Sequence, residues 1–229
     1  MSHIPAPEPF LGVILLDTHF MRPAGDIGQE LTYSRAGIPA RFLRVPSATA
    51  RRVVKEADPL LLQPFIEAAQ TLEQQGAALI TTSCGFLARY QQVLQSCVDV
   101  PLISSSLLMC RTLPDVGIVT FDAQSLSVDV LSGADVPVHT PIEGLQAGCS
   151  MQTAILQDQP HMDLHQACAD VVAAARRLVE RHPGLKHLVL ECTNMPPYRE
   201  AVAQATSCQV HDLETLLVAQ WPEVLKRRR

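Results

Sequence analysis

Short apolar segments rich in branched residues alternate along this chain with amphipathic segments, in which apolar residues recur at intervals of three and four. Such alternation is typical of parallel sheets that carry helices on their faces. The segments with strand character are residues 12–17, 41–45, 77–82, 101–104, 116–120, 136–140, 187–191 and 209–211. The segments with helix character are residues 59–75, 85–96, 164–181, 197–205 and 213–225. The alternation predicts an α/β protein.

Part of this pattern occurs twice in the sequence. Residues 12–17 form an apolar run that begins with glycine and ends with aspartate, and residues 117–122 form a second run of the same kind. Residues 77–84 and residues 187–192 make another matched pair, because each is an apolar strand that ends at a cysteine. Matched pairs in the same order indicate an internal duplication.

The duplication predicts two pseudosymmetric halves, each built on a parallel sheet. We place the first half at residues 11–105 together with residues 208–229, and the second half at residues 106–207. The matched cysteines, Cys84 and Cys192, then follow equivalent strands at the carboxyl edges of the two sheets, where α/β proteins bind ligands. Two halves packed face to face would place both thiols in the cleft between them, which is a favoured position for a small-molecule site.

Two opposed thiols suit proton transfer without a cofactor. One thiolate removes a proton from a carbon atom, and the other thiol returns a proton from the opposite side, so that the stereocentre inverts. Because a free thiol is mostly protonated at neutral pH, the thiolate needs stabilisation. Predicted helices begin at Gly85 and at Pro197, shortly after the two cysteines, and their N-termini would stabilise a thiolate or bind a substrate carboxylate.

The sequence resembles the aspartate/glutamate racemase superfamily over most of its length. The strongest match is Cys-Thr-Asn-Met-Pro at residues 192–196, which is similar to the Cys-Thr-x-x-Pro motif at the second catalytic cysteine of glutamate racemases. Asp17 and Thr18 are similar to the Asp-Ser pair that this family has beside its first base. The resemblance implies a two-domain α/β fold, one catalytic cysteine from each half and no cofactor.

Two positions depart from the pattern of the amino acid racemases. Gly85 and Phe86 stand where glutamate and aspartate racemases have Asn-Thr, and Asn194 replaces a histidine of glutamate racemases. The superfamily also contains hydantoin racemases, maleate isomerases and arylmalonate decarboxylases, and the last of these use a single catalytic cysteine. The motifs therefore support cysteine chemistry more strongly than they support glutamate as the substrate.

We predict a cofactor-independent racemase or epimerase of a small carboxylate-bearing molecule, such as an amino acid or a hydantoin. Cys84 and Cys192 would act as the opposed acid and base. One alternative is a maleate-type cis-trans isomerase, or a related lyase, that uses a cysteine as nucleophile. A second alternative is a non-catalytic protein that binds small carboxylates.

Polar residues near the ends of the strands are expected to bind the substrate carboxylate. Hydroxyl, amide and backbone N–H groups are suitable donors. The predicted substrate-binding residues are Asp17, Thr18, Thr82, Ser83, Gly85, Ser104, Thr120, Thr193 and Asn194. A turn or helix-cap role remains the alternative for each of them taken singly.

Charge and hydropathy argue against two classes of partner. A net charge of −5 argues against broad binding to a nucleic acid backbone. No apolar run approaches the roughly 20 residues that span a membrane, and the first residues lack the pattern of a signal peptide. We therefore expect a cytoplasmic protein with a small-molecule substrate and without nucleic acid or membrane partners. A homo-oligomer is compatible with such a fold.

The cysteines and other ligand-forming residues give no sign of a metal or a cofactor. The seven cysteines lack the paired spacing of zinc sites or of disulfide frameworks, so reduced thiols are expected. His161 and His165 are four residues apart, but the predicted helix begins between them and no catalytic glutamate follows. Glycine-rich phosphate loops are absent as well. We expect Cys149 to lie in a mobile loop without a chemical role.

Overall fold

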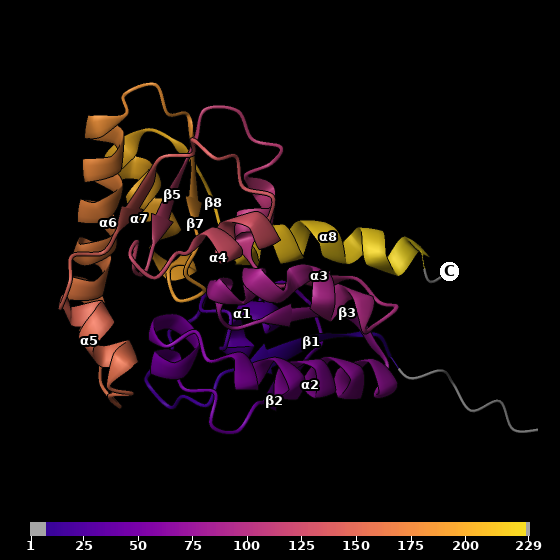
Figure 1. The fold of residues 1–229 in the computed structure, drawn as a ribbon. Helices are drawn as coiled ribbons and strands as arrows, with labels where there is room; N and C mark the ends of the chain where they lie inside the picture. The colour runs from indigo at the N-terminus through magenta and orange to yellow at the C-terminus, as the bar shows by residue number, and fades with distance from the viewer. Residues whose placement is uncertain (1–7, 228–229) are drawn as a thin grey trace, which may run out of the picture.

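Two parallel sheets of four strands each form the framework of the protein (Figure 1). The computed structural model describes residues 8–227. The first sheet has the order β2-β1-β3-β4 and contains β1 (Phe10–Leu15), β2 (Ala40–Arg44), β3 (Ala77–Thr82) and β4 (Leu102–Ile103). The second sheet has the order β6-β5-β7-β8 and contains β5 (Val116–Thr120), β6 (Ile142–Gly144), β7 (His187–Leu190) and β8 (Gln209–His211). The predicted α/β class is confirmed.

Helices connect the strands and cover the sheets. The helical segments of the first half and of the connection to the second are α1 (Glu30–Ser34), the π-helical turn η1 (Arg51–Lys55), the 3-10 turn η2 (Pro59–Leu61), α2 (Leu62–Gln74), the 3-10 turn η3 (Gly85–Tyr90), α3 (Gln91–Ser96) and the 3-10 turn η4 (Ser106–Met109). Those that follow are α4 (Val128–Gly133), α5 (Ser150–Leu156), α6 (Leu164–Arg181), the 3-10 turn η5 (Pro196–Tyr198), α7 (Arg199–Thr206) and α8 (Leu213–Arg227). In the described residues, no helix is both long and apolar enough to cross a membrane.

The two halves repeat one topology. β1 and β5 hold the same position in their sheets, and β3 and β7 hold the next position. These are the strands that the internal sequence repeat pairs. Both central pairs are parallel, with Val13 opposite Thr81 in the first sheet and Ile118 opposite Val189 in the second. The duplication therefore places Cys84 and Cys192 after equivalent strands.

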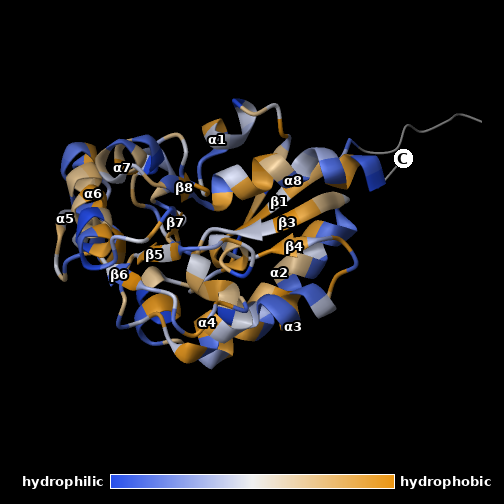
Figure 2. Ribbon diagram, turned by 90° about the horizontal axis from the view of Figure 1, so that it is seen from above, coloured by the Kyte–Doolittle hydropathy of each residue, from blue (hydrophilic) through white to orange (hydrophobic). Residues whose placement is uncertain are grey.

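The apolar sequence of the central strands follows from their burial on both faces. Every residue of β3 and of β5 is buried, as expected for parallel strands with helices on either side. In β1, successive side chains point to opposite faces, so Phe10 and Ile14 enter the main core whereas Leu11 and Val13 pack beneath α8. Figure 2 shows these mainly hydrophobic strands surrounded by helices whose residues alternate between hydrophilic and hydrophobic.

The segment that returns from the second half is divided between the two halves. β8 pairs with β7 in the second sheet, with Val210 opposite Leu188. Only α8 packs on the first half, where Leu217 and Trp221 join the cluster that contains Leu11. The predicted boundary at residue 207 therefore falls before the last strand of the second half.

One predicted strand is wrong. Residues 136–140 end in a turn, in which the Thr140 N–H donates a hydrogen bond to the carbonyl of Pro137, and the strand β6 begins later at Ile142. Pro137 and Pro141 lack the N–H groups that a strand in this segment would use. The apolar residues of this segment thus belong to a connection and not to the sheet.

Candidate active site

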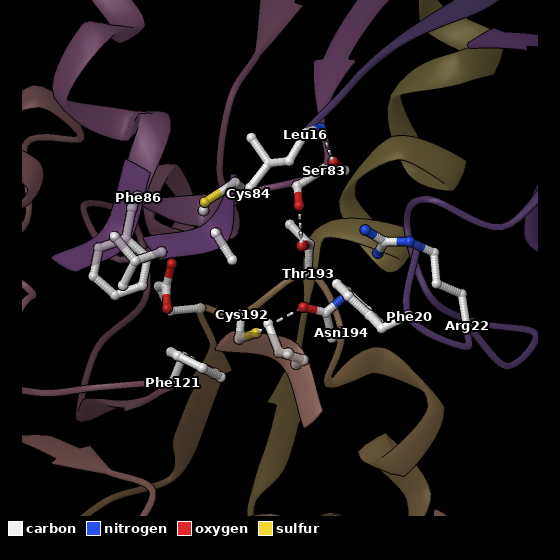
Figure 3. Close-up of a pocket in the computed structure, with 15 residues that line it drawn as sticks. Leu16, Phe20, Arg22, Ser83, Cys84, Phe86, Phe121, Cys192, Thr193 and Asn194 are labelled. Atoms are coloured by element: carbon white, nitrogen blue, oxygen red, sulfur yellow. Dashed lines mark hydrogen bonds between the residues drawn. The ribbon is translucent and has the colours of Figure 1, made fainter. Parts of the chain in front are cut away.

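A cavity between the two halves contains both predicted catalytic cysteines (Figure 3). Cys84 directly precedes η3 in the first half, and Cys192 follows β7 in the second. The cavity volume is about 30 Å³, which is room for about two water molecules. Figure 3 shows the two thiols in the middle of the site, with Phe86 and Phe121 on one side of them and Phe20 and Arg22 on the other.

The structure brings part of the predicted site together around this cavity. The predicted residues that line it are Ser83, Cys84, Gly85, Cys192, Thr193 and Asn194. Two interactions between the halves fix them, since Thr193 Oγ1 donates a hydrogen bond to the Ser83 carbonyl (2.7 Å) and the Ile27 N–H donates one to the Thr193 carbonyl (3.1 Å). The duplicated strand ends therefore form one continuous surface.

Other predicted substrate-binding residues do not line the cavity, and their side chains form hydrogen bonds with other parts of the protein. Asp17 accepts a hydrogen bond from the Ser47 N–H (2.8 Å), and Thr82 Oγ1 donates one to the Ser104 carbonyl (2.8 Å). Ser104 Oγ in turn donates to Gln91 Oε1 (2.6 Å). The position of Asp17 differs from the substrate contact that the family resemblance implies, because this carboxylate is turned to the loop after β2.

Thr18 and Thr120 lie one contact behind the cavity wall. Thr18 Oγ1 accepts a hydrogen bond from Arg22 (2.9 Å), and Thr120 Oγ1 donates one to Glu191 (2.8 Å). Neither threonine lines the cavity, but each contacts a charged residue that does. Their role in this structure is therefore to position those charged groups.

The Cys84 thiol is protonated in the unliganded protein. Burial raises the pKa of Cys84 to about 12, and the charge of Glu191 contributes to the rise. The backbone N–H groups of Phe86 and Leu87 at the start of η3 act in the opposite direction, because they hydrogen-bond the sulfur. The turn that the sequence predicted as an anion-stabilising helix start thus supplies donors, but burial outweighs them.

The Cys192 thiol is also protonated. Burial raises the pKa of Cys192 well above its ordinary value, and the charge of Glu191 is the second cause. Cys192 Sγ donates a hydrogen bond to Asn194 Oδ1 over 3.4 Å. Both thiols therefore need a change in their surroundings, such as a bound cation, before either becomes a thiolate.

A hydrogen-bonded network fixes the wall on the Arg22 side. Arg22 donates to Asp26 (2.8 Å), and Asn194 Nδ2 donates to the other oxygen of the same carboxylate (2.7 Å). Asp26 is fully buried. Because its two carboxylate oxygens bind Arg22 and Asn194, this network joins the loop after β1 to the turn after Cys192. The sequence showed no pattern that singles out Arg22, because the residue reaches the cavity from an irregular loop.

Glu191 is a second cavity residue that sequence reasoning missed. Its carboxyl group is fully buried, and Oε2 accepts the hydrogen bond from Thr120 whereas Oε1 has no hydrogen-bond partner among residues 8–227. Burial raises the pKa of Glu191 to about 7, although Thr120 and the Phe121 N–H lower it. The available signal was a charged residue at the end of an apolar strand, directly before the second cysteine.

Two contacts between the halves lie next to residues of the cavity wall. Asp158 accepts hydrogen bonds from the backbone N–H groups of His19 (2.6 Å) and Phe20 (2.8 Å), and Lys55 Nζ lies 2.5 Å from Asp122 Oδ2. Phe20 lines the cavity, as does Val54 beside Lys55. These contacts therefore join the two halves beside the cavity.

Comparison with solved structures identifies the fold. Allantoin racemase from Klebsiella pneumoniae superposes with a TM-score of 0.69 at 13% identity, over 96% of this chain and 88% of that one. Glutamate racemase from Thermus thermophilus gives 0.59 at 21% identity, over 98% and 83%. The chain has the aspartate/glutamate racemase fold. Unliganded arylmalonate decarboxylase shares this racemase fold with a TM-score of 0.61 at 15% identity, over 95% and 92%.

Within this racemase fold, the relatives found by sequence are dimethylsulfoniopropionate lyases. The lyase of Durusdinium sp. clade D is 27% identical over 217 residues, which are 88% of this chain and 70% of that protein. Dimethylsulfoniopropionate lyase 7 of Emiliania huxleyi (strain CCMP1516) is 26% identical over 226 residues, which are 90% of this chain and 64% of that protein. This chain thus spans about two thirds of their length. No family model matches it.

These relatives correct the predicted function. The prediction of a racemase or epimerase is wrong, because the proteins that match by sequence, at 25–28% identity, are named lyases, whereas the racemases share the fold at low identity. The comparisons support an enzyme but not the predicted isomerase class. The alternative that included a lyase with a reactive cysteine agrees better with them.

His161 and His165 are four residues apart in the sequence, which is a spacing that metal ligands can have. Among the described residues, no group of three or more histidine, cysteine, aspartate or glutamate side chains could hold a metal ion. Cys149 lies at the N-cap of α5 and is partly buried, so the predicted loop position is adjacent to a helix start.

Proposed function

We propose that the protein is a lyase that eliminates a sulfide from a small sulfonio carboxylic acid, with dimethylsulfoniopropionate as the first candidate. The observation that carries this proposal is the sequence match to lyases of that name, which extends over 88–91% of this chain. A match of that extent includes both halves and therefore both thiols of the cavity. The fold alone does not specify the reaction.

The chemistry that this substrate requires is simple. Dimethylsulfoniopropionate has a carboxylate at C1 and a positively charged sulfonium group on C3. A base removes a proton from C2, the electrons of that C–H bond form the C2–C3 double bond, and the C3–sulfur pair leaves with the sulfur. The products are acrylate, dimethyl sulfide and a proton. The reaction needs one base and no redox partner.

The two cavity thiols are the proposed source of that base. Cys84 and Cys192 line the cavity from opposite halves, and burial raises the pKa of both thiols, which favours the protonated form. A cationic substrate would favour the thiolate form, because an opposite charge nearby lowers a thiol pKa. The base would thus form only when the substrate is present, which limits side reactions of the thiolate with other electrophiles.

Arg22 is the proposed partner of the substrate carboxylate. Its guanidinium lines the cavity, and its hydrogen bonds to Asp26 and Thr18 leave further N–H donors. A guanidinium is well suited to a carboxylate because several of its N–H groups lie in one plane. In Figure 3 Arg22 lies on one side of the thiols, so a carboxylate there would place C2 of the substrate near the sulfur atoms.

The experiment that tests this function is a proton NMR assay of the purified protein with dimethylsulfoniopropionate and with homologous sulfonio acids. The proposal predicts acrylate and dimethyl sulfide in equal amounts, at a rate proportional to protein concentration. If the folded protein releases no sulfide from any of these sulfonio acids, the proposed function is contradicted. Conversion of maleate by the same preparation would instead support the cis-trans isomerase alternative.

A further inference from the structure

Glu191 differs from Arg22, the other charged residue among those that line the cavity, because its charge is not paired with an opposite charge. Arg22, on the far side, is paired with the buried carboxylate of Asp26 at 2.8 Å. Glu191 Oε2 accepts one hydrogen bond from Thr120, and Oε1 has no hydrogen-bond partner within the part of the chain that the structure describes. A buried carboxylate without such a partner is destabilising unless a ligand compensates it. The cavity is thus built to receive a positive charge at this end.

Phe86 and Phe121 belong to the segments that border the Glu191 carboxyl group. Phe121 directly follows Thr120, and its own N–H contacts the Glu191 carboxylate. Phe86 follows Gly85, where an added Cβ would lie 2.2 Å from Glu191 Oε1. Both rings are buried and line the cavity (Figure 3). The faces of aromatic rings attract cations, and rings near a carboxylate are a common means of binding sulfonium and quaternary ammonium groups.

We propose that Glu191, Phe86 and Phe121 form a subsite for the cationic group of the substrate, which takes a sulfonium or a quaternary ammonium. The proposal rests on the proposed function for the identity of the substrate. It deepens that function by assigning the two ends of a zwitterion, with the carboxylate toward Arg22 and the cation toward Glu191. An onium group has no N–H to donate, so it matches a carboxylate oxygen that faces apolar surfaces.

A different role for Glu191 makes different predictions. If Glu191 only accepted a proton from one of the thiols, its replacement would slow turnover. The ratio of the affinities for a cationic and a neutral ligand would then stay the same. If Glu191 binds the cation, its replacement removes that preference even for ligands that never react. Binding of unreactive probes therefore separates the two roles.

The test uses two probes of the same shape that differ in one charge. Both probes have a carboxylate, and they are named for their other end. The cationic probe is 3-(trimethylammonio)propanoate and the neutral probe is 4,4-dimethylpentanoate, in which carbon replaces the nitrogen. Isothermal titration calorimetry at pH 8 gives the Kd of each for the wild type and for Glu191→Gln. The wild type should prefer the cationic probe by at least about tenfold, which is the range of a desolvated cation–aromatic and carboxylate contact. Glu191→Gln should abolish the preference and change the affinity for the neutral probe by less than about twofold.

A pH series on the wild type supplies a second readout should the variant fail to fold. The affinity for the cationic probe should fall about tenfold per pH unit below pH 7, because the Glu191 carboxyl group is protonated there. The affinity for the neutral probe should not fall. The titratable groups that face Glu191 are Cys84, directly before η3, and Cys192, after β7, and both stay protonated in this range. The series thus follows Glu191.

Two results would overturn the subsite. One is equal affinity of the wild type for both probes, and the other is a preference that survives in folded Glu191→Gln. The failure of the proposed function looks different: a clear preference for the cationic probe without sulfide release from dimethylsulfoniopropionate would leave the subsite standing and remove the lyase. Sulfide release without the preference would do the reverse.

Discussion

Close packing at Gly85 explains why a glycine follows the first cysteine. A Cβ at this position would lie 2.2 Å from Glu191 Oε1 and 2.4 Å from the Glu191 carbonyl oxygen. The carbonyl oxygen belongs to the backbone directly after β7 and cannot rotate away as a side chain can. Contacts that short do not occur, so a side chain here would push the two halves apart. Glycine is required at this point for the close approach of two chain segments and not for an unusual backbone angle.

Replacement of Gly85 by alanine should therefore destabilise the protein. Overpacking of this kind costs about 1–3 kcal/mol, and we expect a lower urea midpoint together with weaker binding of both carboxylate probes. Gly184→Ala is the matched control, since no atom lies within 4 Å of its Cβ position. Equal midpoints for the two variants would show that Gly85 is not tightly packed in solution.

The buried Glu191 carboxyl group should make stability depend on pH. Its pKa is about 7 in the folded protein against an ordinary value of 4.5, so unfolding releases a proton between these values and stability falls as pH rises through them. The total is on the order of 3 kcal/mol. Glu191→Gln cannot titrate, so its stability relative to the wild type should increase by about that amount from pH 4.5 to pH 8. Urea unfolding at both pH values measures the difference, and parallel pH curves for the two proteins would contradict it.

The segment at residues 48–56 borders the cavity and is joined by an ion pair to the other half. It contains η1, whose Val54 lines the cavity, and Ser47 and Ala57 on either side have positive φ values of 63° and 49°. Such angles are unfavourable for residues other than glycine. The segment therefore stays in place through its contacts, among which is the ion pair between Lys55 and Asp122.

Removal of that ion pair should loosen the segment. Lys55→Met keeps most of the side-chain length and loses the charge, and amide hydrogen exchange over residues 48–56 should become faster, whereas exchange in β3 stays the same. Lys186→Met, which breaks the exposed pair with Asp115, is the control and should leave residues 48–56 unaffected. Unchanged exchange in Lys55→Met would mean that other contacts hold the segment closed.

Several elements could be predicted from the sequence, whereas three short helices could not. β3, β5 and α6 have the predicted bounds, because both strands are buried along their whole length and α6 keeps its apolar interval over 18 residues. The three-residue strand β8 also has the predicted bounds, although none of its residues is fully buried. The predictions omitted α1, α4 and α5, which have five to seven residues each. Helices of that length show less than two full repeats of an apolar face, so packing and not local pattern determines them.

At the scale of the whole molecule, the duplication explains why part of the site could be predicted. Equivalent strands end at equivalent edges, so the repeat alone brought Cys84 and Cys192 to one cavity. Arg22 and Phe20 come from a loop that the repeat does not contain. Glu191 was visible only as a polar residue at a strand end. The reaction class was mispredicted because the fold is shared by racemases and by other enzymes, and the motif around the cysteines does not specify which bond breaks.

The proposed function requires the two cavity thiols to act together on a sulfonio acid. Gas chromatography of dimethyl sulfide released from dimethylsulfoniopropionate tests it most directly, for the wild type, Cys84→Ser, Cys192→Ser and the control Cys97→Ser, whose thiol does not line the cavity. Loss of a general base typically costs 10²–10⁴-fold in rate. We predict a loss of about that size in at least one cavity variant, a clear decrease in the other and no change in the control. Release of dimethyl sulfide at the wild-type rate by both cavity variants would contradict this requirement.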